Sequence, residues 1–210
     1  MLPSSISTLS HPPAASALWL VRHGESTWNE LGLAQGHRDD AELTARGMDQ
    51  AAAVAEQFRG LAVSALYSSD LRRAVQTADA FSKVLGLPVI KDGRLRERNM
   101  GVLEGGPLAA ATPDKTGLAG GIVIDPDSSP DRGESVRELY QRAAAFCDDL
   151  ADQPGTQAAD VVVVAHGGTL RVLRAYLAGI PVEQMSWEPL ANASVLRIGA
   201  FSVNNRGGTQ

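Results

Sequence analysis

The sequence predicts an α/β fold, a single three-layer α/β/α domain with a mostly parallel sheet. Apolar segments of strand length alternate along the chain with segments in which apolar residues recur at helical spacing. Two strand segments, residues 18–21 and 161–165, are apolar without polar alternation, which is typical of parallel strands buried on both faces. The 210 residues suit one domain, and 44% hydrophobic residues allow a sizeable core.

Turn and cap residues delimit the individual elements. Five strands are expected, at residues 18–21, 63–67, 88–90, 161–165 and 193–198. The first long helix begins at Thr44, a candidate N-cap, carries Met48 on its apolar face and stops by Gly60. The turn at 68–70 is expected to cap a second helix that ends at Gly86. Two more helices are expected over 135–151 and 167–179.

Three segments depart from this alternation. Residues 1–16 and 204–210 are predicted to be disordered tails that flank one folded domain over 17–203. Residues 105–133 are rich in glycine and proline and keep neither helical nor strand periodicity. A long irregular segment inside a compact domain is typical of a functional lid or insertion. We therefore expect residues 105–133 to determine substrate specificity.

Composition limits the classes of partner and compartment. The formal net charge of −5 gives no overall electrostatic case for nucleic acid. No apolar run approaches the roughly 18 residues of a membrane span, so no membrane partner is expected. The first 17 residues contain no Lys or Arg, unlike a secretory signal. The single cysteine, Cys147, excludes a disulfide within the chain and fits a reducing, cytoplasmic location.

Two histidines follow two of the predicted strands in the same pattern. His23 stands behind Arg22 at the end of 18–21, and His166 ends the run 161–165; a glycine follows each. Ligand crevices of open α/β sheets lie at the carboxyl ends of the strands. The glycine before the next helix lets backbone N–H groups approach an anion. Taken alone, Arg22 and His23 could equally be leaving the core for solvent, and His166 could equally be a core or rim histidine. The repeated pattern favours one shared site.

Charged residues in two other segments could belong to the same site. Arg72 and Arg73 begin a helix, where the dipole disfavours cations, so their position suggests an anionic ligand. Arg72 is expected in solvent, whereas Arg73 shares a helix face with Thr77 and is the better pocket candidate. Glu97 and Glu104 lie in a glycine-containing loop, and either could be a proton donor or an ordinary surface residue.

These motifs resemble the histidine phosphatase superfamily, which contains cofactor-dependent phosphoglycerate mutases and many phosphatases. Residues 20–29, Leu-Val-Arg-His-Gly-Glu-Ser-Thr-Trp-Asn, are close to the family's signature. The other family blocks follow in the same order, at 43–50, 68–77, 95–105, 133–135 and 166–167. The resemblance covers about residues 18–198 and implies the family's phosphoglycerate mutase-like fold.

The resemblance also implies a role for each site residue. His23 would be the nucleophile that forms a phosphohistidine, and Glu97 would protonate the leaving oxygen and then activate water. No metal and no cofactor are expected, because arginines would supply the charge that Mg²⁺ supplies in other phosphoryl-transfer enzymes. The phosphoryl oxygens would be held by Arg22, Arg73, a protonated His166, Asn29, Gln35 and the amide of Gly167.

Departures from the mutase pattern favour a phosphomonoesterase. The family's mutases carry tyrosine where this chain has Met100 and typically asparagine where it has Gly168. They also hold a substrate carboxylate with paired arginines in a longer insertion, whereas residues 105–133 offer only Lys115 and Arg132. A cofactor-dependent phosphoglycerate mutase is the alternative, and a non-catalytic interaction module of the same fold is a further one.

The substrate is expected to be a small phosphorylated metabolite. Small and apolar side chains in residues 105–133 predict a roomy pocket with little fixed charge. Such a pocket predicts broad acceptance of phosphomonoesters and weak preference for highly anionic ones. A homodimer is compatible with the sequence, which does not define the oligomeric state.

Overall fold

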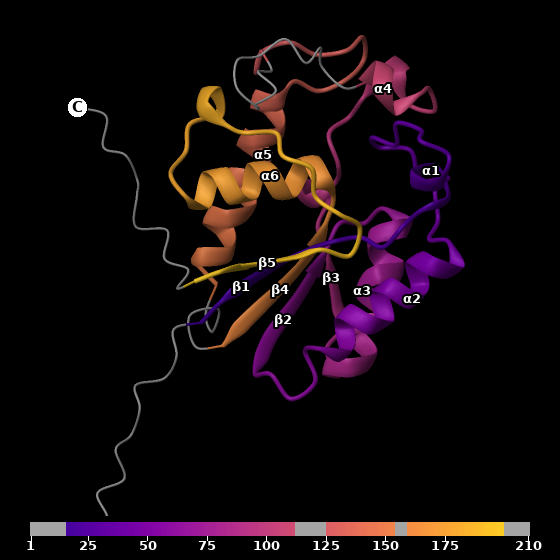
Figure 1. Ribbon diagram of the computed structural model, residues 1–210. Coiled ribbons are helices and arrows are strands. Elements are labelled where there is room, and N and C mark those ends of the chain that lie inside the picture. Colours follow the sequence, from indigo (N-terminus) through magenta and orange to yellow (C-terminus); the bar gives the residue numbers. More distant parts are fainter. Residues whose placement is uncertain (1–15, 112–124, 154–158, 200–210) are drawn as a thin grey trace, which may run out of the picture.

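A computed structural model provides the structure of the protein and describes residues 16–111, 125–153 and 159–199. A central sheet carries helices on both of its faces (Figure 1). The predicted three-layer α/β/α architecture is therefore confirmed. Of the predicted tails, 204–210 and all of 1–16 except Ser16 lie outside the described residues, and Ser16 is buried.

The sheet is mostly parallel, as predicted. Its strand order is β3-β2-β4-β1-β5. β4 pairs in parallel with both β1 and β2, and β3 pairs in parallel with β2, whereas β5 runs antiparallel to β1. Every predicted strand end lies within two residues of the observed one. The strands are β1 (Leu18–Arg22), β2 (Val63–Ser68), β3 (Val89–Lys91), β4 (Asp160–Ala165) and β5 (Val195–Ile198).

Two core clusters fill the space between the sheet and the helices. The side chains of β4 alternate between them: Val161 and Val163 face α5 and α6, whereas Val162 and Val164 face α2 and α3. A strand covered on both faces has no solvent side, which explains four consecutive valines. The helices are α1 (Thr27–Glu30), α2 (Ala45–Glu56), α3 (Arg72–Leu85), α4 (Leu108–Ala111), α5 (Val136–Ala151) and α6 (Gly167–Leu177).

The helices α2 and α5 begin where the sequence predicts, whereas the N-cap of α3 differs from the prediction. The Thr44 side chain accepts the Gly47 N–H at 3.0 Å and begins α2, as predicted. Ser135 forms a capping box at the start of α5. α3 instead has Leu71 as its N-cap, with no side-chain cap, so the predicted cap at 68–70 is wrong. Asp70, the last residue of this turn, forms an ion pair with Arg96 at 2.6 Å.

α2 is also shorter than predicted, and its apolar face differs. Met48 is 46% exposed rather than packed, because the buried side of α2 is formed by its small residues Gly47, Ala51 and Ala55. Within 105–133, the structure describes 105–111 and 125–133. The first of these ranges contains only the single-turn helix α4, consistent with the predicted absence of long periodic elements.

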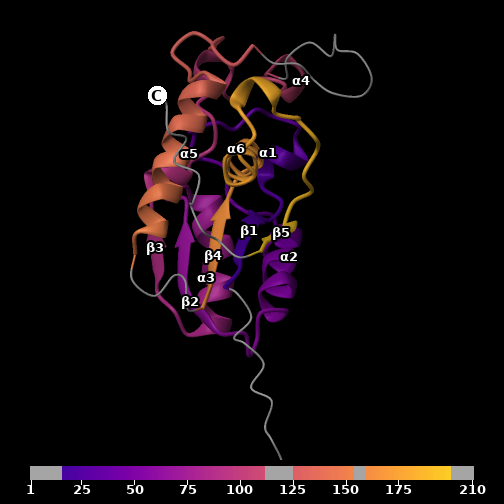
Figure 2. The same ribbon diagram turned by 90° about the vertical axis from the view of Figure 1, so that its left-hand side faces the viewer.

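The topology brings several chain segments to one edge of the sheet. Arg22 at the end of β1 is in register with Ala165 at the end of β4, and Ser68 at the end of β2 is in register with Val164. The carboxyl ends of three parallel strands therefore meet. α1 and α4 lie beyond this edge (Figure 2). Because β5 is antiparallel, its first residues reach this edge as well.

Candidate active site

His23 and His166 lie side by side at the carboxyl ends of β1 and β4. The His23 N–H donates to the Ala165 carbonyl at 3.0 Å, which continues the strand pairing by one residue. The two imidazole centroids are 5.1 Å apart, with the ring planes tilted by 58°. Both side chains are buried, His166 completely. The fold thus joins two residues that are far apart in the sequence.

The surroundings of His23 define which of its nitrogens can react. Nδ1 lies 2.7 Å from the Gly24 carbonyl oxygen, which can only accept, so Nδ1 carries the proton. Nε2 therefore keeps its lone pair. Burial lowers the pKa of His23 well below its usual value, and the charges of Arg73 and Arg22 lower it further. His23 is neutral at pH 7, as a nucleophile must be.

The surroundings of His166 favour its neutral form when no anion is bound. Its Nδ1 and Nε2 are both buried and find no hydrogen-bond partner among the described residues. Burial lowers the pKa of His166 well below the usual value, and the charges of Arg73 and His23 act in the same direction. A protonated His166 that holds a phosphoryl group stays a prediction.

Two guanidinium groups lie beside the histidines with part of their donor capacity unused. Arg73 is fully buried, and its Nη1 and Nη2 donate to the carbonyls of Arg38 and Gly36, each at 2.9 Å. Arg22 donates through Nη1 to the Leu190 carbonyl. The Nε atoms of both arginines are buried without a partner among the described residues. Burial lowers the pKa of Arg73 to about 10.

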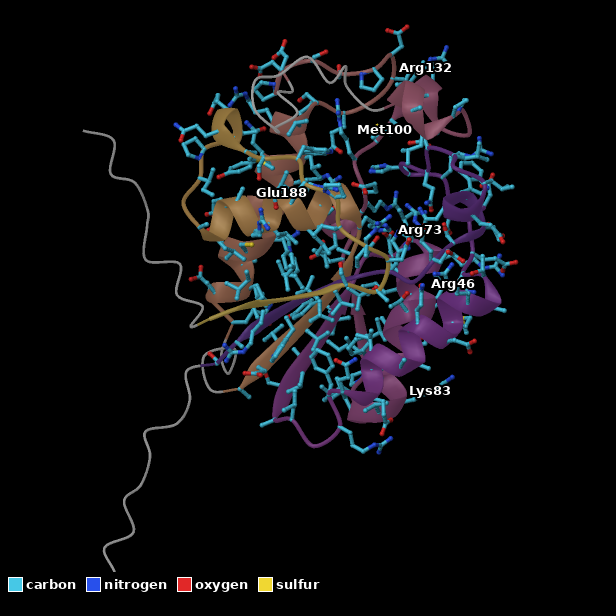
Figure 3. The ribbon with its side chains drawn as sticks, in the orientation of Figure 1. Arg46, Arg73, Lys83, Met100, Arg132 and Glu188 are labelled. Carbon is cyan, nitrogen blue, oxygen red and sulfur yellow. The ribbon has the colours of Figure 1, made fainter. Side chains whose placement is uncertain are left out.

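Unpaired buried donors are costly, because each forfeits its hydrogen bond to water. Four buried nitrogens of two arginines and one histidine have no partner among the described residues, and at least three of them carry a proton, because even a neutral imidazole has one N–H. The site is therefore organised for an acceptor-rich anion. Arg73 comes from the first turn of α3 (Figure 3). Its neighbour Arg72 is exposed to solvent, as predicted, and forms an ion pair with Glu42 at 2.8 Å.

The structure distinguishes the two candidate carboxylates. Glu97 accepts the Gly168 N–H at the start of α6 through Oε2 at 3.0 Å, next to His166. Glu104 instead accepts the backbone N–H groups of His37 and Met100, at 2.8 and 3.0 Å. Glu104 therefore connects two loops, whereas the Glu97 carboxylate lies at the start of α6, beside His166.

Asn29 and Gln35 approach the site from α1 and the loop after it. Both amide oxygens lie within hydrogen-bonding distance of the Ser26 hydroxyl, Asn29 Oδ1 at 3.0 Å and Gln35 Oε1 at 2.9 Å, and its single proton can go to one of them at a time. With these carbonyl oxygens engaged, the amide nitrogens are the groups left to donate to a ligand. Gly167 is the first residue of α6, so its N–H has no acceptor within the helix. The structure thus brings the predicted phosphate-binding residues to the same edge.

Sequence reasoning missed Asn192, which ties the two sides of the site together. Its Nδ2 lies 3.0 Å from Asn29 Oδ1 and 3.3 Å from the carbonyls of His23 and Gly24. The neighbouring Ala193 has a left-handed φ of 55° and donates its N–H to the His23 carbonyl at 3.1 Å. In the sequence, Asn192 is visible only as a polar residue just before the last predicted strand. It can be assigned to the site only once that strand is known to be antiparallel.

Arg142 was missed as well, although the family block at 133–135 ends at Ser135, the N-cap of α5. Arg142 lies on α5 and forms a bidentate pair with Glu134, at 2.6 and 2.9 Å. Its Nη atoms donate to the carbonyls of Arg94, Arg96 and Glu97 at 2.6 to 2.8 Å. One guanidinium therefore holds the backbone from which the Glu97 side chain projects.

Neither a metal site nor a membrane-spanning helix is found among the described residues. No group of three or more His, Cys, Asp or Glu side chains is arranged to hold a metal ion in the described part of the chain. Among the same residues, no helix combines the length and apolar character that crossing a bilayer requires. Metal independence and the cytoplasmic location stay predictions.

Comparison with known proteins agrees with this fold. The model of the histidine phosphatase superfamily (branch 1) matches residues 18–205. The chain therefore belongs to the histidine phosphatase superfamily.

Its relatives within the family carry two kinds of name. The chain is 36% identical to a protein of Yersinia enterocolitica called probable phosphoglycerate mutase GpmB, over 86% of this chain and 83% of that protein. It is similar in structure to a mycobacterial glucosyl-3-phosphoglycerate phosphatase complexed with VO3, with a TM-score of 0.74, 34% identity and coverage of 87% and 92%. YhfR of Bacillus stearothermophilus gives a TM-score of 0.74, 29% identity and coverage of 93% and 98%.

Proposed function

We propose that this protein is a metal-independent phosphatase that hydrolyses small phosphomonoesters through a phosphohistidine on His23. The observation that carries the proposal is the set of buried, unpartnered nitrogens of Arg22, Arg73 and His166 around a neutral His23. A phosphoryl group offers the acceptor oxygens that the N–H groups among these nitrogens lack among the described residues. Similarity to a solved phosphatase over 87% of the chain supports the same reaction class.

In the first step, His23 Nε2 attacks the phosphorus atom and the bond from phosphorus to the ester oxygen breaks. Glu97 delivers a proton to that oxygen, so the alcohol leaves neutral and the phosphoryl group stays on His23. Arg22, Arg73 and the Gly167 amide hold the equatorial oxygens. Removing one such donor typically costs about 2.7–4 kcal/mol of transition-state stabilisation.

In the second step, water attacks the same phosphorus atom and the bond from phosphorus to Nε2 breaks. Glu97 takes the proton from the water, and inorganic phosphate leaves. The Nδ1–H bond to the Gly24 carbonyl holds the ring in one orientation through both steps. A bound phosphoryl dianion also raises the proton affinity of His166, so that His166 can donate to it although it is neutral without an anion.

A phosphoglycerate mutase is the second candidate, because a relative 36% identical carries that name. A mutase returns the phosphoryl group from His23 to a substrate hydroxyl instead of to water, so the same residues serve both reactions. Gly168 favours the phosphatase. A Cβ built on Gly168 would lie 2.3 Å from Glu97 Oε1, so the Glu97 carboxylate uses space that a larger residue at this position would need.

The test is phosphate release from p-nitrophenyl phosphate, glycerol 3-phosphate and 3-phosphoglycerate, with and without 2,3-bisphosphoglycerate. We expect release without the bisphosphate from wild type and none from His23→Ala. Activity that requires 2,3-bisphosphoglycerate and yields 2-phosphoglycerate supports the mutase instead. A wild-type protein that releases no phosphate from any monoester contradicts the phosphatase and favours the non-catalytic module.

A further inference from the structure

Arg171 lies next to the proposed phosphoryl site but has no role in the steps above. It projects from α6, one to two turns after His166. Arg171 Nη1 lies 3.1 Å from the position that a Cβ on Gly167 would take, and Arg22 Nε lies 3.7 Å from the same position. Two guanidinium groups therefore flank Gly167. The absence of a side chain at Gly167 gives both of them this close approach.

The coil after α6 holds Arg171 in place. Arg171 Nε donates to the Glu188 carbonyl at 2.6 Å, and the guanidinium carbon lies 5.2 Å from the centroid of the Trp187 ring. Figure 3 shows Glu188 on this coil, which passes over α6. Leu190 of the same coil accepts from Arg22. One segment thus orients both arginines before any ligand binds, which lowers the entropic cost of binding.

No carboxylate in the described part of the chain forms an ion pair with Arg171. Among the described residues it donates only the bond to Glu188. Arg174, one turn further along α6, does pair with the Glu188 carboxylate, at 3.6 Å. Burial lowers the pKa of Arg171, the carboxylate of Glu97 raises it, and the charge of Arg171 in turn lowers the pKa of Arg22. Two adjacent cations with one nearby carboxylate leave net positive charge beside the scissile phosphoryl.

We propose that Arg171 binds a second anionic group of the substrate, a carboxylate or a second phosphate, close to the phosphoryl group that is removed. The proposal rests on the proposed function, since it requires that Arg22 binds the phosphoryl group. It reverses the sequence-based expectation of a weak preference for highly anionic substrates. That expectation considered charges only in 105–133, whereas Arg171 comes from α6.

A kinetic test uses matched substrates that differ in one anionic group. 3-Phosphoglycerate differs from glycerol 3-phosphate by a carboxylate in place of a hydroxymethyl group. Glucose 1,6-bisphosphate differs from glucose 6-phosphate by a second phosphate. We expect Arg171→Gln to reduce kcat/KM at least about tenfold more for one anionic member than for its partner, as loss of a charge-assisted hydrogen bond predicts. The pair that responds identifies the anion.

The control is Arg174→Gln, which removes a partly exposed arginine from the same helix. It should leave unchanged the ratio of kcat/KM for the anionic substrate to kcat/KM for its partner, in both pairs. Equal losses on both members of each pair would assign Arg171 to the phosphoryl clamp or to structure and overturn the proposal. The proposal would also be overturned if Arg171→Gln left the ratio of kcat/KM within each substrate pair unchanged, or if wild type did not prefer either anionic substrate.

Calorimetry separates this proposal from the proposed function. His23→Ala lacks the nucleophile, so it can bind each substrate without turnover. We expect it to bind the anionic member of the responding pair at least about tenfold more tightly, and His23→Ala/Arg171→Gln to lose that difference. If no phosphate is released from any ester but this difference persists, the phosphatase is wrong and the anion subsite stands. If the difference is absent, the subsite is wrong.

Discussion

His23 and His166 are buried imidazoles whose pKa values lie well below the usual value, chiefly because burial penalises the charged form. The unfolded chain binds a proton at each of them near pH 6.5, whereas the folded chain does not. The free energy of unfolding therefore falls as the pH drops below about 6.5, toward the lower folded pKa. Above that value both states are neutral and the two residues contribute no pH dependence.

The lowered pKa values predict that wild type and His166→Gln differ in how the free energy of unfolding depends on pH. Each buried histidine contributes a slope of up to about 1.4 kcal/mol per pH unit below pH 6.5. Urea unfolding between pH 5 and 8 should therefore show a shallower fall in stability for His166→Gln. Between pH 7.5 and 8 the two slopes should agree, which serves as the internal control. Equal slopes below pH 6.5 would show that His166 is protonated in the folded protein.

Residue-scale roles were only partly predictable. His23, His166 and Arg73 could be found because strand ends and a cationic helix start are visible in sequence. Arg142 and Arg171 could not, since an arginine within an amphipathic helix looks like an ordinary surface charge until the fold shows what lies opposite. The neutral state of His166 was unpredictable for a related reason, because burial from several directions depends on tertiary packing.

At the scale of elements, the start of α6 positions the proposed proton donor. The Gly168 N–H holds Glu97 Oε2 at 3.0 Å, and Arg142 of α5 fixes the Glu97 backbone. A Cβ at Gly168 would contact Glu97 Oε1 at 2.3 Å, but this oxygen ends a flexible side chain that can move aside. A substitution there should displace the carboxylate without disrupting the helix.

We therefore expect Gly168→Ala to reduce kcat/KM by roughly tenfold to a hundredfold on glycerol 3-phosphate, part of what a general acid contributes. The loss should be much smaller on p-nitrophenyl phosphate, whose leaving group needs no proton. The melting temperature should change little. Gly93→Ala is the control, since no atom lies within 4 Å of a Cβ at that position. Equal losses on both substrates would contradict the role of Glu97.

Element positions were predictable to within two residues for the strands because their apolar runs are short and sharply bounded. The cap of α3 was not, since Ser69 and Asp70 are both good capping residues by type. Asp70 pairs with Arg96 of a distant loop instead. Tertiary contacts thus override a local preference that is otherwise strong.

At the scale of the whole molecule, the topology assembles the site. Adjacent parallel strands β1 and β4 place the two histidines together, and antiparallel β5 brings Asn192 to the same edge. Alternation of strands and helices predicted the parallel part of the sheet. No comparable pattern in the sequence tells whether the outermost strand, β5, runs parallel or antiparallel to its neighbour. The contribution of Asn192 could therefore not be predicted.

The central claim is that His23 becomes phosphorylated during turnover. The most direct test uses a phosphomonoester with a radiolabelled phosphoryl group as the substrate and quenches the reaction within milliseconds. The label is then mapped by mass spectrometry of the digested protein. We predict one phosphoryl group per chain on His23, labile in acid and stable in base, and none in His23→Ala. Phosphate release at the wild-type rate without any labelled His23 would contradict this account.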